Sequence, residues 1–234
     1  MALMAVDQAP KAPPVPAIAG AEPCTRQTAH LRADAVRNSD SIVCAAAAAF
    51  TEHGTDVALE EIARRAGVGI ATLYRRFPTR DALIETVLDE TMRHYADRTE
   101  EAASQAVTEP WEALSSYLMF VMEHQATDPA FADTLVAPQF GSQIFAAEHQ
   151  RAFEASLVLV DRVVAAGVVR PDFHHADLHL LILANAGVAR ATRRTAPQAW
   201  RRFTAYMLDA FRHVTDEALP TVPSVWERAV RGSR

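Results

Sequence analysis

The chain has 234 residues, of which 50% are hydrophobic and 22% charged, and its formal net charge is −6. This is the composition of a soluble globular chain with a sizeable core, long enough for one or two domains. Two cysteines, Cys24 and Cys44, exclude a disulfide framework, and neither lies in a C-x-x-C pattern. The longest apolar run, near residues 180–189, is far short of the roughly 20 residues that span a bilayer, and no leader pattern precedes it. We therefore expect a cytoplasmic protein that makes no contact with membranes.

The N-terminal region changes character at Leu31. Residues 1–30 carry five prolines and little that could form an apolar face, which predicts a flexible tail with no function that the sequence reveals. From Leu31 onward, apolar residues recur at helical spacing as far as His53, and Gly54 supplies a stop. The pattern predicts a first helix that ends at His53.

Two short helices and a longer one follow. A helix is predicted from about 57 to 66, with Asp56 as its candidate cap, and Gly67 ends it. A second short helix over 70–76 stops before Phe77-Pro78, because the residue that precedes a proline is driven out of the helical region. Thr79 is the expected cap of the next helix.

The remainder also has helical periodicity, with no alternating strand pattern. Helices are predicted from Pro110, from about 145 to Gly167, from 178 to about 194, and from Pro197. The expected fold class is all-α, with roughly nine helices and no internal repeat.

Positive charge is concentrated around the two short helices. Between Ile62 and Arg80 there are five arginines and no carboxylate, whereas residues 31–95 as a whole have 8 Arg against 10 Asp and Glu. Two short helices joined by a glycine-containing turn are typical of a helix-turn-helix, and local cations suit the phosphates of a duplex. The alternative is a solvated three-helix bundle with an arginine-rich face.

Two segments carry a family resemblance. "GVGIATLYRRFPTRDALI", with "AAAAFTEHG" upstream, resembles the DNA-binding domain of the TetR family of transcriptional regulators over about residues 32–88. The resemblance implies an all-helical homodimer with an N-terminal DNA-binding domain and a C-terminal domain that binds an inducer and dimerises. We accordingly divide the chain into a DNA-binding domain at 31–90 (helix-turn-helix about 57–76), a ligand-binding and dimerisation domain at 91–216, and a tail at 217–234.

The resemblance also assigns DNA contacts. The residues that fall where the family's recognition helix and its flank meet the duplex are Ile70, Ala71, Thr72, Tyr74, Arg75, Arg76 and Arg80. Arg75 suits a bidentate bond to guanine, whereas Thr72 and Tyr74 suit phosphate oxygens. Packing between helices is the alternative for Tyr74, and a solvated face is the alternative for Arg76. Gly69 and Ala58 replace hydroxyl residues that are frequent in the family.

A ligand pocket is expected between the later helices, where aromatic side chains stand in helical register. The candidate residues are Trp111, Tyr117, Phe120, Phe145, His149 and Phe153. Ordinary core packing is the alternative for each. The expected effector is a small apolar or amphipathic molecule, and neither its identity nor the direction of its effect is fixed by the sequence.

The last two predicted helices carry a dimer hypothesis. Ala184, Gly187 and Ala191 form a small-residue stripe, and a second, apolar face contains Trp200, Phe203 and Met207. Two such helices from each subunit would form a four-helix interface, and the two-fold symmetry would match a palindromic operator. The alternative is that these helices cover the core of their own chain.

Metal binding and catalysis are not favoured by the motifs. The cluster at 172–179 places His175 and His179 one turn apart, but it opens a helix, where polar caps are expected, so we predict neither a metal nor a cofactor. No motif of a nucleophilic, phosphate-binding or zinc enzyme occurs, so the chain is not expected to be an enzyme. The predicted function is ligand-released repression through operator DNA. The alternative is a helical ligand-binding or protein-interaction module that does not bind an operator.

Overall fold

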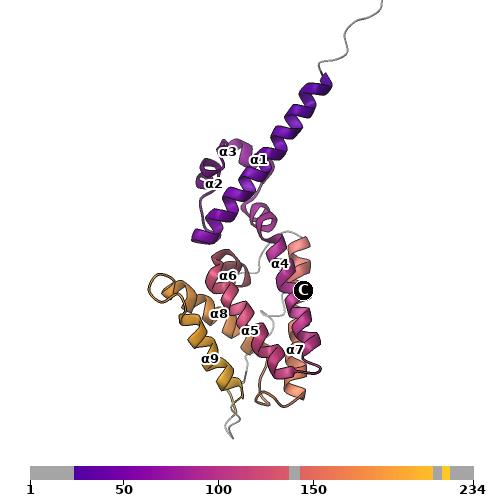
Figure 1. Cartoon of the computed structure of the whole chain (residues 1–234), viewed down its shortest axis with the longest axis vertical. Coiled ribbons are helices and arrows are strands. Elements are labelled where there is room, and N and C mark those ends of the chain that lie inside the picture. Colours follow the sequence, from indigo (N-terminus) through magenta and orange to yellow (C-terminus); the bar gives the residue numbers. More distant parts are fainter. Residues whose placement is uncertain (1–23, 137–142, 213–217, 222–234) are drawn as a thin grey trace, which may run out of the picture. The chain divides into compact units, whose positions relative to one another are not determined.

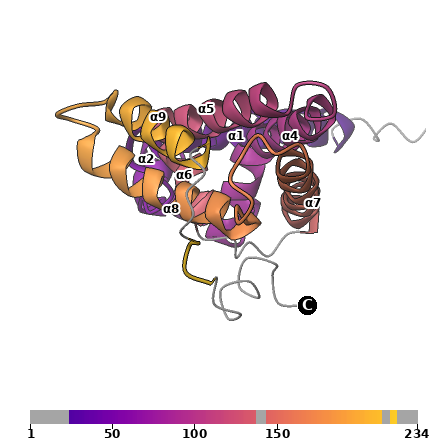
Figure 2. The same ribbon diagram turned by 90° about the horizontal axis from the view of Figure 1, so that it is seen from below.

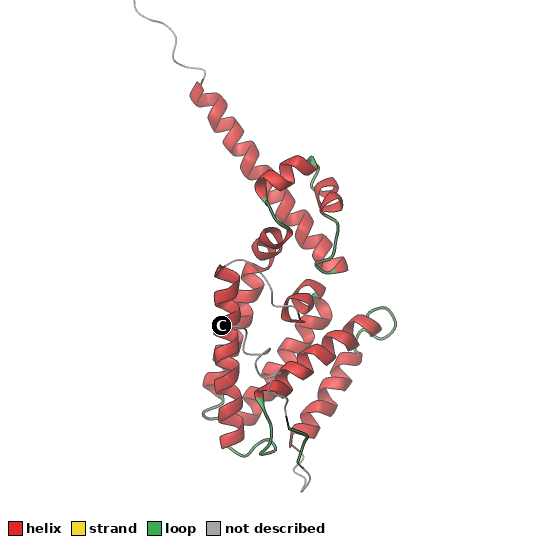
Figure 3. Cartoon of the chain, turned by 180° about the vertical axis from the view of Figure 1, so that it is seen from behind, coloured by secondary structure: helices red, strands yellow, loops and turns green. Residues whose placement is uncertain are grey.

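A computed structural model describes the backbone of residues 24–136, 143–212 and 218–221, and the side chains of these residues except 24–37 and 143–145. The described residues form nine helices and no strand (Figures 1 and 3), which confirms the predicted all-α class. The chain divides into two units, residues 1–37 and 38–234. Within the described part, no helix is both long and apolar enough to cross a membrane.

The first helix, α1, extends over Cys24–His53. It ends where the sequence predicts, because Gly54 adopts a φ of 81° and its N–H donates to Phe50 O at 2.8 Å. It starts earlier than expected, however. Residues 24–30 were assigned to a flexible tail at 1–30 but belong to the helix, and residues 1–23 lie outside the described part.

The two short helices are α2 (Leu59–Arg65) and α3 (Ile70–Arg76). Gly67 makes the turn between them in the left-handed region, with a φ of 68°. The cap predicted at Asp56 is wrong, because α2 begins after Ala58 and no side chain caps it. Gly69 stands at the same position before α3, again without a side-chain cap, as expected where a hydroxyl is missing.

The long helix α4 (Arg80–Gln105) begins as predicted. Thr79 Oγ1 accepts a hydrogen bond from the N–H of Ala82 at 3.1 Å, and Asp81 lies in the first turn. The helix continues without a break past residue 90. The proposed boundary between a DNA-binding domain at 31–90 and a ligand-binding domain at 91–216 therefore falls inside a continuous helix.

Five further helices follow: α5 (Pro110–Thr127), α6 (Pro129–Val136), α7 (Gln143–Ala165), α8 (His175–Thr192) and α9 (Ala199–Arg212). Four match predicted helices to within a few residues. The sequence analysis missed α6, whose eight residues are too few to display a periodicity. Its start is set by Asp128, whose Oδ1 accepts from the N–H groups of Ala130 and Phe131.

Two packing arrangements organise α4 to α9. The helix α7 lies along α4, whereas α5 packs against α8 and α9, which also contact each other (Figures 1 and 2). One continuous hydrophobic core passes through all of these helices and includes Phe50, Leu73, Phe131 and Trp200. Because this core reaches from α1 to α9, residues that flank the helix-turn-helix are packed together with residues of the larger helical part.

Candidate nucleic-acid interface and effector-binding helices

The helix α3 is fixed by apolar residues on one side and exposes polar residues on the other. Leu73 is fully buried, and Phe77, just after the helix, is buried beside it. Tyr74, one residue beyond Leu73, is 47% exposed, and Arg75 is exposed as well. Because a helix turns 100° per residue, anchoring Leu73 directs its two C-terminal neighbours away from the core. The alternative that Tyr74 serves helix packing is not favoured by this exposure.

The other predicted DNA contacts have mixed surroundings. Ile70 and Thr72 are half-buried, and Ile70 packs against the core, while Ala71 is exposed. Arg76 is exposed, and its Nε donates to Ser39 Oγ at 3.1 Å. Arg75 makes no hydrogen bond or ion pair with any described residue. As far as the described residues go, a ligand could therefore bind its guanidinium without displacing another partner.

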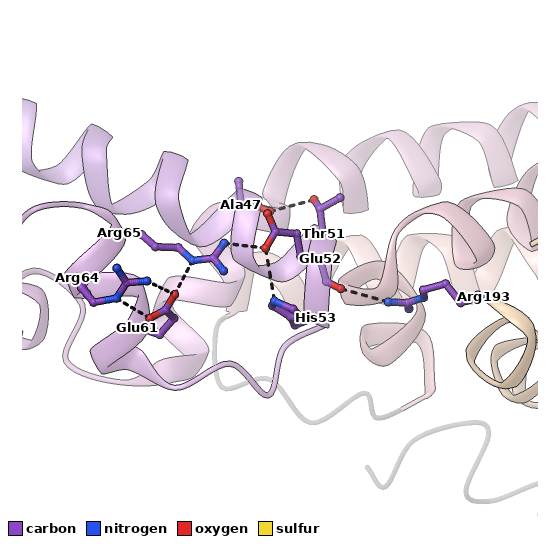
Figure 4. A network of polar contacts seen from close by, with 8 residues as sticks. All are labelled: Ala47, Thr51, Glu52, His53, Glu61, Arg64, Arg65 and Arg193. Carbon is purple, nitrogen blue, oxygen red and sulfur yellow. Dashed lines mark hydrogen bonds and ion pairs between the residues drawn. The ribbon is translucent and has the colours of Figure 1, made fainter. Parts of the chain in front are cut away.

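The two arginines of α2 are already paired, a feature that sequence reasoning missed. Figure 4 shows Arg64 and Arg65 both directed at Glu61. The Nε atom of each arginine lies 2.8 Å from a carboxylate oxygen of Glu61. Arg65 also bonds Glu52 on α1 at 2.8 Å. The hydrogen bonds from Arg64 and Arg65 lower the pKa of Glu61 to about 2, so this carboxylate stays charged at any physiological pH.

This pairing reduces the positive charge that the arginine-rich segment at 62–80 can offer to a ligand. Of its five guanidinium groups, the two on α2 are partly neutralised by Glu61, whose position at i−3 and i−4 was visible in the sequence. The unshared positive charge of the helix-turn-helix is therefore centred on α3, at Arg75 and Arg76.

Arg80 has a structural role that the sequence did not reveal. Its Nη1 donates to Thr55 O at 2.8 Å and to Val57 O at 2.7 Å, and both bonds are partly buried. The guanidinium of α4 thus satisfies two carbonyls of the loop between α1 and α2. A phosphate contact by the same side chain stays a prediction, but it would have to use the other guanidinium nitrogens.

Replacing Arg80 by alanine is expected to destabilise the fold as well as to weaken DNA binding. Two partly buried carbonyls lose a charged donor, which costs about 2 to 3 kcal/mol of unfolding free energy. Urea unfolding monitored by circular dichroism measures this loss. Arg64→Ala is the matched control, because it removes the same charge from a side chain that is 73% exposed. Equal stability of the two variants would show that the loop contacts of Arg80 contribute nothing.

Two of the predicted effector residues lie in an aromatic set between α4, α5 and α6. Tyr117 is buried, and its hydroxyl lies 3.3 Å from that of Tyr95. Burial raises the pKa of both phenols, so they remain neutral hydrogen-bonding groups. Phe120 is half-buried and contacts His124 with its ring tilted by 46°, the ring centroids being 4.2 Å apart. We use the name "α5 aromatic set" for Tyr95, Tyr117, Phe120, His124 and Phe131.

Two more predicted residues, His149 and Phe153, share one face of α7. The ring of Phe153 meets His175 of α8 edge-on at 5.0 Å, and His175 Nε2 lies 2.7 Å from Ser156 Oγ. Burial lowers the pKa of His149 to about 4, so its imidazole is neutral at pH 7. Neither His175 nor Ser156 was predicted as an effector residue, although Ser156 stands one further turn along the same face as His149 and Phe153.

The remaining effector candidates stand apart. Trp111 is half-buried, and the guanidinium of Arg212 on α9 lies 4.5 Å from its ring centroid. The side chain of Phe145 lies outside the described residues. Among the described ring contacts, the predicted residues therefore fall in three separate places: the α5 aromatic set, the face of α7 that meets His175, and the contact of Trp111 with Arg212.

Buried amides join α5 to α8. Asn185 Nδ2 donates to Gln125 Oε1 at 3.0 Å and to Met122 O at 3.3 Å, while Gln125 Nε2 donates to Ile182 O at 3.1 Å. Asn185 is fully buried, and its Oδ1 accepts no hydrogen bond from the described residues. The sequence did not single out this pair, because isolated amides in apolar helices carry no spacing signal.

The cluster at 172–179 is a helix start, as predicted. His174 Nδ1 accepts from the N–H of Ala176, and Asp177 Oδ2 accepts from the N–H of His174, which together form a capping box. Asp172 pairs with Arg170, and the hydrogen bond from this guanidinium lowers the pKa of Asp172 to about 2. Over the described residues, no three His, Cys, Asp or Glu side chains are placed to hold a metal ion.

The predicted dimerisation residues divide into two groups. Ala184, Gly187 and Ala191 are exposed along one side of α8, and Leu180 on the same side is 50% exposed. Trp200, in contrast, is 2% exposed because α9 packs it against the helices of its own chain. Its assignment to a dimer interface is therefore corrected to core packing, whereas Phe203 and Met207 are half-buried.

Two family models match the chain. The model described as bacterial regulatory proteins of the TetR family matches residues 42–87, which include α2 and α3. The C-terminal domain of SbtR-like transcriptional regulators matches residues 109–213, from the start of α5 to the end of α9. Among curated proteins, no relative matches this chain.

Proteins of known structure are also similar to this chain. A TetR transcriptional regulator from Streptomyces coelicolor is 34% identical, with 74% of this chain and 97% of that one covered and a TM-score of 0.44. The MbdR regulator from Azoarcus sp. CIB is 21% identical, with 75% and 97% covered and a TM-score of 0.54. A gamma-butyrolactone receptor is 20% identical, with 74% and 85% covered and a TM-score of 0.51.

Proposed function

The chain belongs to the TetR family of bacterial transcriptional regulators, and from this premise we propose that it is a repressor that binds a palindromic operator as a homodimer. Members of the family are ligand-responsive, DNA-binding regulators and not enzymes. In this proposal a small apolar or amphipathic molecule releases the operator, and the protein acts in the cytoplasm, where the chromosome lies.

The observation that carries the proposal is the outward face of α3. Tyr74 and Arg75 are exposed on a helix whose opposite side is anchored by Leu73. The rigid anchor supports insertion into a major groove, and a guanidinium without an intramolecular partner among the described residues suits guanine O6 and N7. Arg76 and the half-buried Thr72 flank this face and suit phosphates.

The test is a titration of duplexes that cover the DNA upstream of the protein's own gene and its neighbours, against random duplexes of equal length. Specific binding is expected on at least one upstream fragment, with an affinity that falls steeply as salt rises. Equal binding to random DNA, or no binding at low salt, would contradict operator recognition. The alternative of a helical ligand-binding or interaction module without an operator would then stand.

A second copy of the chain is proposed to cover the small-residue stripe of α8. Leu180, Ala184, Gly187 and Ala191 repeat at intervals of four, three and four residues, which places them on one helical face. Phe203 and Met207, which are half-buried, extend the apolar area onto α9. In a two-fold interface this surface would pack against its own symmetry mate.

Ala184→Glu is expected to separate the dimer. A two-fold interface buries the new carboxylate twice without a partner, so the mass by light scattering should fall to that of a monomer, and operator affinity should drop by more than about tenfold. Val158→Glu is the matched control, since it adds the same charge at a 41% exposed position on α7. A dimeric Ala184→Glu protein would exclude this face as the interface.

The effector is proposed to bind between the helices α4 to α8, at the aromatic side chains described above. The α5 aromatic set supplies flat apolar surface with two neutral phenols at its buried end. The neutral imidazole of His149 adds a hydrogen-bonding group with no charge to attract an ion. These features support an uncharged, amphipathic molecule as the effector.

A further inference from the structure

One carboxylate on α6 holds the loop between α1 and α2. The backbone N–H of Thr55 donates to Asp133 Oδ2 at 3.0 Å, and the hydroxyl of Thr55 donates to the same oxygen at 3.3 Å. The two residues are 78 positions apart in the sequence, and their contact is partly buried. Two donors converge on one oxygen, so the bond is both charge-assisted and directional.

Gly54, in the loop between α1 and α2, leaves room for the carboxylate of Asp133. Gly54 is buried and has a φ of 81°, and a Cβ atom at that position would overlap Asp133 Oδ2 and lie 3.7 Å from Pro129 Cβ. The backbone conformation therefore favours glycine, and a larger residue would also push the Asp133 carboxylate aside. The sequence signal at Gly54 was a helix stop, and the contact with α6 is a second, independent constraint on the same residue.

The same loop is held by α4, which begins just after the recognition helix. Arg80 donates to Thr55 O and Val57 O. Thr55 is therefore bonded to α6 through its N–H and to α4 through its carbonyl oxygen. Only Phe77, Pro78 and Thr79 separate Arg80 from the end of α3. A displacement of the loop is thus passed to the residues that position α3.

On another side of α6, Phe131 belongs to the α5 aromatic set. Phe131, two residues before Asp133, is fully buried, and its ring centroid lies 5.5 Å from that of Tyr95 and 5.8 Å from that of His124. Phe131 and Asp133 are on one short helix, which is capped by Asp128. A molecule that shifts α6 through the ring of Phe131 would therefore also move the carboxylate of Asp133.

We propose that Asp133 is a positioning residue that latches the α1–α2 loop in the operator-binding arrangement and reports the state of the α5 aromatic set to α3. The proposal rests on the proposed function, because it requires operator binding. By thermodynamic reciprocity, if the arrangement of α6 changes operator affinity, operator binding must also change the stability of α6. That reciprocal effect can be measured without knowing the effector.

The experiment combines operator titration with hydrogen exchange on the full-length protein. Asp133→Ala is expected to raise the Kd for the operator about tenfold, which corresponds to one charge-assisted hydrogen bond. Asp161→Ala is the control, because it removes the same charge from an exposed position on α7. In the unsubstituted protein, operator binding is expected to slow exchange in the peptide 129–136, and this slowing should disappear in Asp133→Ala.

A second measurement keeps the proposal testable if Asp133→Ala folds poorly. Asp133→Asn retains an acceptor oxygen and should lie between Asp133→Ala and the unsubstituted protein in operator affinity. Gly54→Ala should cost less operator affinity in the Asp133→Ala background than alone, because the overlap with the carboxylate is gone while the backbone strain remains.

The outcomes distinguish a failure of the proposed role of Asp133, here called the latch, from a failure of the proposed function. If the unsubstituted protein binds no operator, the proposed function fails, and the latch fails with it. If it binds an operator but exchange in 129–136 does not respond, or Asp133→Ala and Asp161→Ala bind equally well, the latch alone is overturned.

Discussion

Arg75→Ala is expected to lower operator affinity by roughly 5- to 150-fold, the equivalent of about 1 to 3 kcal/mol for a bidentate contact with guanine. The side chain is exposed on α3, and among the described residues it has no partner that competes with DNA. Because the lost contact reads a base, affinity for random duplexes should fall far less than affinity for the operator.

Titrations of operator and random duplexes at several salt concentrations measure both effects. Arg64→Ala removes the same charge from α2, where the guanidinium is bonded to Glu61. We expect this control to have a small effect that is equal on both DNAs. Equal losses on operator and random DNA for Arg75→Ala would mean that Arg75 binds phosphate instead of a base.

Trp200→Ala is expected to cost about 3 to 5 kcal/mol of unfolding free energy. The indole is 2% exposed within a single chain, where α9 packs against α5 and α8. For a chain of this size, such a loss lowers the melting temperature by roughly 6 to 20 °C. The effect should persist at low protein concentration, since the indole is buried without any partner subunit.

Thermal unfolding followed by circular dichroism at two protein concentrations tests this expectation. Tyr206→Ala is the control on the same helix, because Tyr206 is 61% exposed and its hydroxyl accepts a hydrogen bond from the exposed Arg202. A destabilisation of Trp200→Ala that appeared only in the concentrated sample and was lost on dilution would return the indole to the dimer interface, where the sequence had placed it.

Local signals were sufficient for most helix boundaries. Gly54, Thr79 and Pro110 each act on the backbone of their own turn, as a left-handed stop, a hydroxyl cap and a first-turn proline. The helix α6 was missed because its eight residues are almost entirely apolar, and a segment buried on nearly every side displays no amphipathic period.

Charge was harder to interpret than helicity. The sequence shows five arginines without a carboxylate between Ile62 and Arg80, and the spacing of Glu61, just before this interval, indicates its pairing with the two on α2. It does not show that Arg80 turns toward backbone carbonyls. A count of charges along the chain ignores partners that are distant in the sequence. On α3 the structure leaves Tyr74 and Arg75 exposed, and these are the residues proposed to contact DNA.

The sequence by itself determined the helical class, the position of the helix-turn-helix and the family, because periodicity, caps and turn glycines are properties of neighbouring residues. Only the tertiary structure decided that Trp200 belongs to the core and that Asp133 meets Thr55 across 78 positions. Burial and long-range hydrogen bonds depend on which helices pack together. That packing is fixed by the whole core at once, and no single segment encodes it.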